Sequence, residues 1–200
     1  MTLALLADLA QVLAEVFLEP DAALKEGLEE LLAEGPEPAL AEPLHRMVEH
    51  TLQPQEQAVE YTRLFLQAKD TDVVHLFESA HARGHLMAPE VLAPLQAIYD
   101  EADISLQEDL TIPPDHLGLE LACLSFLLGQ VIDGDSAESA RCLTLAQRLV
   151  QGHLRPFTTA VAEQLQEVAG LPYYLAALDL AVSLLPAVEQ ALVGTTNQLD

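Results

Sequence analysis

Residues 113–132 read PPDHLGLELACLSFLLGQVI, and this stretch indicates the fold class more clearly than any other part of the chain. Leucine and other apolar residues recur at intervals of three and four, which is the period of an α-helix with a buried face. Two prolines open the stretch and Asp-Gly-Asp follows it, and both are signals for the ends of a helix. The pattern predicts a core helix over residues 115–132.

The same signal repeats along the chain. Leucine and alanine dominate, β-branched residues are sparse, and proline and glycine fall between the periodic segments. Thr2 and Asp21 are suitable N-caps for the first two helices, and residues 103–112 have the character of a loop. We expect helices over residues 3–17, 22–34, 38–51, 54–68, 73–82, 89–102, 115–132, 136–150, 156–169 and 172–193.

These segments predict the fold class. We expect an all-α protein in which nine or ten helices form a single globular domain over residues 1–200. A chain of 200 residues is long enough to bury one large core. The alternative is a looser N-terminal subdomain over residues 1–52.

The charge of the chain limits its partners. Asp and Glu number 32 against 8 Lys and Arg, which gives a formal net charge of −24. Such a surface repels phosphate backbones and anionic lipid headgroups, so nucleic-acid binding and membrane attachment are poor expectations. A basic ligand or segment is favoured instead.

The compartment follows from the apolar stretches and the cysteines. Residues 171–193 are interrupted by Asp179, Pro186 and Glu189, so we expect a buried helix rather than stable membrane insertion. The N-terminus lacks the basic region of a signal peptide, which favours a cytoplasmic protein. We expect Cys123 and Cys142 to be buried, reduced thiols, since two distant cysteines form neither a disulfide framework nor a zinc cluster.

One pattern suggests a metal site. Glu42 with His45, and Glu78 with His81, both have the Glu-x-x-His spacing that di-iron helix bundles use. Glu42 directly precedes Pro43, however, and such a site needs two more inward-facing Glu residues. A di-metal carboxylate protein therefore stays an alternative. No nucleotide-binding glycine motif or nucleophile elbow is present, so we expect neither a cofactor nor catalysis.

Two further segments, around Tyr61 and around Asp115, indicate a protein family when their order along the chain is considered. The helix around Glu60-Tyr61-Thr62-Arg63-Leu64-Phe65 places Tyr61, Leu64 and Phe65 on one stripe, which alone is typical of a core. Downstream, Pro-Pro-Asp-His-Leu opens the helix predicted above, and HLFESAHARG lies between the two. This order resembles the TorD/DmsD/NarJ family of chaperones, with the middle segment most similar to the NarJ branch.

The resemblance implies a function. Members of this family are cytoplasmic, all-helical chaperones for molybdenum oxidoreductases. They bind the N-terminal segment of the catalytic subunit, often a twin-arginine signal or its remnant, until the cofactor is inserted. The partner would thus be a catalytic-subunit precursor with a basic N-terminus, bound by a monomer or a homodimer. A generic acidic helical adaptor is the other alternative that remains.

The resemblance also implies site residues. Tyr61, Leu64 and Phe65 would line or support the groove for the client. Asp115 and His116 would lie at its rim, where Asp115 accepts a hydrogen bond from a client arginine, and Glu120 would be a second acid. The family often has Glu before the Asp-His motif where this chain has Ile112, and this chain lacks tryptophan, so no contact of a tryptophan-containing loop carries over.

Overall fold

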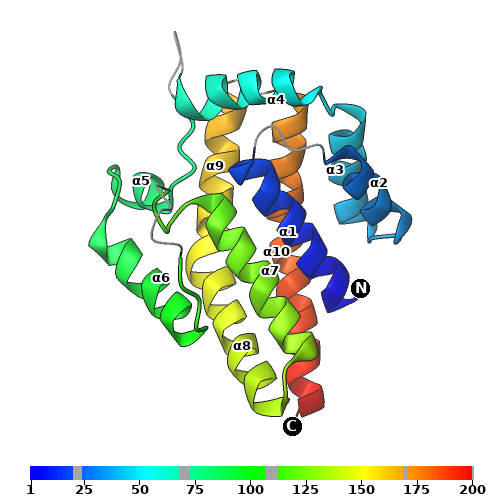
Figure 1. Ribbon diagram of the computed structural model, residues 1–200, viewed down its shortest axis with the longest axis vertical. Coiled ribbons are helices and arrows are strands. Elements are labelled where there is room, and N and C mark those ends of the chain that lie inside the picture. The colour runs from blue at the N-terminus through cyan, green and yellow to red at the C-terminus, as the bar shows by residue number, and fades with distance from the viewer. Residues whose placement is uncertain (20–23, 68–72, 107–111, 169–170, 200) are drawn as a thin grey trace.

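The computed structural model describes residues 1–19, 24–67, 73–106, 112–168 and 171–199 (Figure 1). These residues form ten α-helices, two π-helical turns and a single-residue β-bridge, which confirms the all-α class. The helices are α1 (Leu3–Leu18), α2 (Lys25–Ala33), α3 (Pro38–Glu49), α4 (Pro54–Tyr61), α5 (Glu78–Arg83), α6 (Pro89–Glu101), α7 (Leu117–Asp133), α8 (Ser136–Leu149), α9 (Arg155–Glu167) and α10 (Pro172–Leu199). The π-helical turns are Thr62–Leu66 after α4 and Val150–Leu154 between α8 and α9.

The centre of the molecule is the pair α1 and α7, which lie side by side along much of their length (Figure 1). The long helix α10 packs against α1, α3 and α9, and α8 packs against α7. Leucines of α7 at three- and four-residue spacing, among them Leu121, Leu124 and Leu128, are fully buried in one continuous hydrophobic core. The looser subdomain over residues 1–52 stays a prediction, although α1 belongs to this central pair.

Helix α10 is the most apolar part of the core. It is the one helix in the described residues with the length and hydropathy of a membrane span, over Pro172–Thr196. Half of its most apolar window is nevertheless buried inside the fold, and Tyr174 and Leu184 are fully enclosed. These contacts make it a core helix, as the interrupted hydropathy of residues 171–193 predicted.

Several predicted helix ends are confirmed. The Thr2 hydroxyl accepts a hydrogen bond from Leu5 N at 3.3 Å and so caps α1. Asp135 caps α8 by accepting from two backbone amides at 3.0 Å. The expected cap at Asp21 was wrong, because α2 begins at Lys25 with Leu24 as its N-cap. The expected helix ends at residues 68 and 169 lie outside the described residues, as does the middle of the 103–112 loop.

Two predicted helices begin later than expected. Residues 73–76 are extended rather than helical, and α5 begins only at Glu78. Helix α7 begins at Leu117 and not at Asp115, because His116 is its N-cap. The physical reason is shared: these two stretches hydrogen-bond to each other across an antiparallel bridge, and a backbone amide used there is not available to a helix.

The expected break at Gly152 was also wrong. The chain passes from α8 through the π-helical turn Val150–Leu154 into α9 without leaving the helical path. Val150 and Leu154 are fully buried on either side of the glycine. Burial of these neighbours compensates for the low helix propensity of glycine.

The close approach of α1 and α7 depends on Gly118. A Cβ at this position would lie 2.6 Å from Leu18 Cγ and 3.0 Å from the Ala14 carbonyl oxygen. We predict that Gly118→Ala lowers the free energy of unfolding by about 1–3 kcal/mol, because the two helices must move apart. Thermal and urea unfolding measure this loss.

Gly129 on the same helix supplies the matched control. A Cβ there meets nothing within 4 Å, so Gly129→Ala should stabilise the protein by about 0.5–1 kcal/mol. Equal effects of the two substitutions would contradict the proposed contact.

Candidate functional site

Two of the sequence motifs lie directly against each other. The Leu-Phe-Glu-Ser stretch before α5 pairs in antiparallel fashion with the Asp-His-Leu stretch before α7. Glu78 N donates to the Asp115 carbonyl oxygen at 2.9 Å, and Leu117 N donates to the Leu76 carbonyl oxygen at 2.9 Å. The two motifs are therefore one structural unit, from which α5 and α7 both begin.

The side chains of this unit cap both helices. Asp115 Oδ2 accepts from Ser79 N at 2.9 Å, at the start of α5. His116 Nδ1 accepts from Gly118 N at 3.1 Å, at the start of α7. Burial lowers the pKa of His116 to about 4, with the Asp115 charge acting in the opposite direction. A neutral imidazole is what an acceptor at Nδ1 requires.

Glu120 lies one turn further along α7 and is fully buried. Neither of its carboxyl oxygens has a hydrogen-bond partner among the described residues, and the same holds for Asp115 Oδ1. Burial, and after it the charges of Glu78 and Asp115, raise the pKa of Glu120 well above its ordinary value of 4.5. The fold thus favours the neutral acid at this position.

Glu78 makes a buried pair that the sequence did not indicate. His153 Nδ1 donates to Glu78 Oε2 at 2.8 Å, and each residue is only 7% exposed. His153 belongs to the π-helical turn between α8 and α9, and such turns often occur at functional sites. No local pattern could have found this pair, because its members are separated by 75 residues of sequence.

The two Glu-x-x-His motifs of the di-metal alternative make other contacts in the structure. Glu78 binds His153 rather than His81, whose Nε2 lies 2.7 Å from the His75 carbonyl oxygen. Glu42 pairs with Arg46. Within the described ranges, no group of three or more His, Cys, Asp and Glu is arranged to hold a metal ion.

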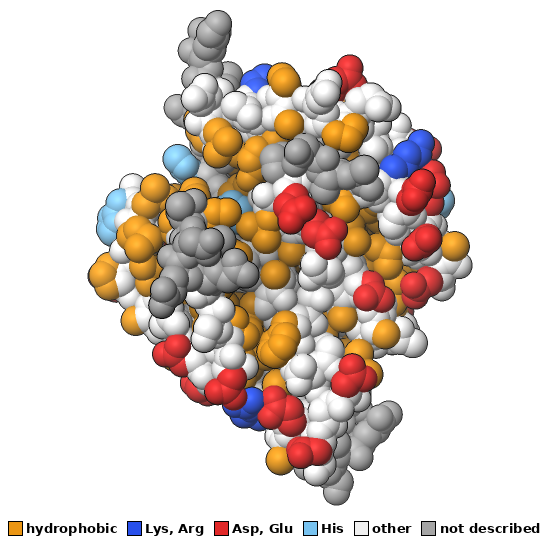
Figure 2. Space-filling model, viewed as in Figure 1, with side chains coloured by type: hydrophobic (Ala, Val, Ile, Leu, Met, Phe, Trp, Pro, Cys, Tyr) orange, Lys and Arg blue, Asp and Glu red, His pale blue; other side chains and the backbone are white. Residues whose placement is uncertain are grey.

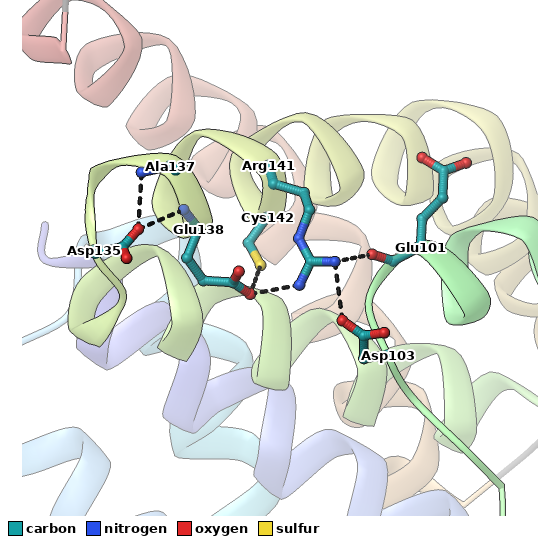
Figure 3. Close-up of polar contacts among 7 residues, drawn as sticks. All are labelled: Glu101, Asp103, Asp135, Ala137, Glu138, Arg141 and Cys142. Atoms are coloured by element: carbon teal, nitrogen blue, oxygen red, sulfur yellow. Dashed lines mark hydrogen bonds and ion pairs between the residues drawn. The ribbon is translucent and has the colours of Figure 1, made fainter.

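A cavity of about 560 Å³ opens beside the Glu78–His153 pair, between α5, α6 and α9. The opposite end of α6, beyond the residues that line the cavity, is bound to α8 (Figure 3). Arg141 donates to the Glu101 carbonyl oxygen at 2.5 Å and to Asp103 Oδ2 at 3.1 Å. Its other terminal nitrogen donates to Glu138 at 2.7 Å.

The end of α6 explains why an aspartate is found at residue 103. Ile104 N donates to the Tyr99 carbonyl oxygen and Asp103 N to that of Asp100, which is the Schellman pattern of helix termination. The pattern needs a left-handed residue, and Asp103 has a φ of +55°. Aspartate tolerates this conformation better than most residues and also binds Arg141.

The aromatic stripe lies in a different cluster. The Tyr61 hydroxyl donates to the Phe17 carbonyl oxygen at 2.8 Å, and Phe65 packs edge-on against Tyr174 with ring centroids 5.3 Å apart. Leu64 is fully buried, and its carbonyl oxygen accepts from Val74 N at 2.9 Å. This last bond joins the aromatic cluster to the extended segment that leads to α5.

The six residues predicted to bind the client are therefore all buried, none more than 7% exposed. The structure brings Asp115, His116 and Glu120 together and places the other three with the aromatic cluster. Their role in binding stays a prediction. The sequence analysis missed Glu78 as a partner of His153, together with the cavity beside them.

Comparison with known protein families decides the family. The family model described as nitrate reductase delta subunit matches residues 21–163, which include both paired motifs and the aromatic stripe. The chain belongs to the nitrate reductase delta subunit family. Membership confirms the resemblance to the NarJ and TorD chaperones and implies a non-catalytic, cytoplasmic assembly chaperone for a molybdoenzyme. A search of curated proteins found no match.

The buried hydroxyl of Tyr61 gives a stability prediction for this delta-subunit chaperone. Tyr61→Phe removes the donor and leaves the Phe17 carbonyl unpaired, so the free energy of unfolding should fall by about 1–2 kcal/mol. Tyr174→Phe is the control, since that hydroxyl reaches its acceptor, the Gln57 carbonyl oxygen, only at 3.4 Å. A loss as large for Tyr174→Phe would contradict the special role of the Tyr61 bond.

Glu120 gives a pH prediction. Because its pKa is raised on folding, its contribution to stability is fully present below pH 4.5 and is lost as the pH rises above that value. We predict that Glu120→Gln removes this loss. The Tm of the variant minus that of the wild type should therefore increase from about pH 4 to about pH 8.

The control for this experiment is Glu30→Gln, which changes the net charge equally at an exposed position of α2. Its difference from wild type should vary much less with pH over the same range. A parallel pH course for the two variants would show that Glu120 ionises in the folded state as it does in the unfolded chain.

Proposed function

We propose that this chaperone binds the basic N-terminal segment of a molybdenum oxidoreductase catalytic subunit, either a twin-arginine signal or its remnant. It holds that segment while the cofactor is inserted and before export. Family membership supplies the molybdoenzyme client. The binding of a basic segment is our inference from the charges of this chain.

The distribution of charge is the observation that carries the proposal. Acidic side chains are spread over the face shown in Figure 2, whereas Lys and Arg are few. Six of the seven Lys and Arg side chains in the described residues already pair with carboxylates of this chain: Lys25, Arg46, Arg63, Arg141, Arg148 and Arg155. The net charge of −24 therefore leaves many carboxylates for a cationic partner. Such a field speeds the encounter with a cationic segment and is screened by salt.

The burial of the predicted residues supports an indirect role for them. We propose that Tyr61, Leu64 and Phe65 support the client groove from the core. Asp115 and His116 would fix the starts of α5 and α7, through the caps on Ser79 and Gly118. Glu120 would adjust the same junction through its buried acid, and the side chains that touch the client would lie around it.

The test is affinity capture of the tagged, full-length protein from its source organism under anaerobic growth, followed by mass spectrometry. We expect recovery of a molybdoenzyme catalytic subunit. Deletion of the N-terminal segment of that subunit should abolish the recovery, because the segment is the bound part. Capture at higher ionic strength should recover less, since salt screens the acidic surface.

A catalytic subunit that is expressed but not captured would overturn the proposal and favour the generic adaptor. Capture that survives deletion of the N-terminal segment would show a client bound through another surface.

A further inference from the structure

The cavity between α5, α6 and α9 has a shape and polarity that none of the predicted site residues explains. Its walls are apolar: Val91 and Pro94 of α6 face Pro156 and Phe157 of α9. Its volume of about 560 Å³ lies within the range of small-ligand pockets. It is larger than a packing defect and can take a side chain from a partner.

The buried end of this cavity is a carboxylate. Glu78 lines it, and one carboxyl oxygen, Oε2, accepts from His153. The other oxygen, Oε1, makes no hydrogen bond within the part of the chain that the structure describes. A second acid, Glu90, lies in the exposed first turn of α6 and also lines the cavity. An entering group thus meets one acid at the opening and another at the end.

This arrangement matches a long side chain with an apolar stem and a cationic head. The methylene groups of arginine or lysine pack well on apolar walls while the head reaches a polar partner. Arginine fits better, because its planar guanidinium donates to carboxylates in a fixed geometry. A purely apolar side chain would instead leave the free oxygen of Glu78 desolvated without a partner.

We propose that this cavity is the subsite for an arginine side chain of the client's basic segment, with Glu78 as its acceptor. This inference rests on the proposed function. It adds a specific place and two contacting residues, Glu78 and Glu90, that differ from the six predicted from sequence.

One cationic side chain of this protein, Arg83, lines the same cavity and repels an entering arginine. Arg83 is exposed at the end of α5, forms no ion pair within the described residues, and reaches only the adjacent Ala82 carbonyl oxygen, at 3.4 Å. Its removal should strengthen the binding of a cation and weaken that of an anion. The effect of substituting Arg83 on affinity therefore shows whether the group that enters the cavity is a cation or an anion.

The experiment measures the affinity of the full-length protein for a synthetic peptide with the N-terminal sequence of the captured catalytic subunit. Glu78→Gln keeps an acceptor for His153 but removes the charge, and it should weaken binding about tenfold or more, as expected for a lost charged hydrogen bond. Glu90→Gln should weaken it a few-fold, since that acid is exposed. Glu30→Gln on α2, with the same change in net charge, should have little effect.

Arg83→Gln tests the sign of the charge and, as an exposed substitution, leaves the core intact. It should tighten peptide binding a few-fold, whereas Lys25→Gln on α2, the matched change in net charge, should alter it little. Weaker binding by Arg83→Gln would overturn the proposal and indicate an anionic occupant.

Peptide variants identify the docked residue. When one arginine of the peptide is replaced by glutamine, the effect of Glu78→Gln should disappear for that peptide alone; replacement by lysine should retain part of it. If no single arginine abolishes the effect of Glu78→Gln, or if Glu78→Gln matches Glu30→Gln, the subsite is wrong. If the wild-type protein does not bind the peptide at all, the proposed function itself fails.

Discussion

Two backbone hydrogen bonds, from Glu78 to Asp115 and from Leu117 to Leu76, determine where α5 and α7 begin. They hold two segments that are distant in sequence at the starts of two helices. The cap that Asp115 provides depends on this pairing, because Asp115 reaches Ser79 N only when the two segments lie side by side. His116 caps α7 from an extended backbone at the bridge. The starts of α5 and α7 consequently depend on the same pairing of segments.

The same junction concentrates buried acids. Glu78, Asp115 and Glu120 lie together with little solvent around them, and only Glu78 has a basic partner, His153. Burying polar groups without partners costs stability, so this junction is less stable than an apolar one of the same shape would be. Natural proteins often retain such a cost at sites of function, which agrees with the position of the cavity next to these residues.

Polar contacts tie α5 and α6 to the helical path that runs from α8 into α9. On one side Arg141 and Arg148 of α8 bind the end of α6 around Glu101. On the other, Glu78 at the start of α5 binds His153 in the π-helical turn. Both sets of contacts come from the helical path that runs from α8 into α9, so the turn at Val150–Leu154 sets the shape of the cavity as well as one of its polar ends.

The sequence by itself determined most of the helices, the all-α class and the net charge of the chain. Helix positions follow from contacts three and four residues apart, and residues 113–132 show this period clearly, although the helix begins two residues later than predicted. Net charge is a sum over residues and needs no structure. The motifs around Tyr61 and Asp115 were also sufficient for the family, which the family model confirms.

Only the tertiary structure decided which residues meet. Residues 73–76 were predicted to be helical but are not, because their backbone groups bond to distant segments: Val74 N donates to the Leu64 carbonyl oxygen, and the Leu76 carbonyl oxygen accepts from Leu117 N. Glu78 has a histidine at helical spacing, His81, yet binds His153 from a distant turn. The burial of Asp115 and Glu120 likewise results from helices packing around them. Long-range pairing depends on the packing of whole elements, and no local periodicity records it.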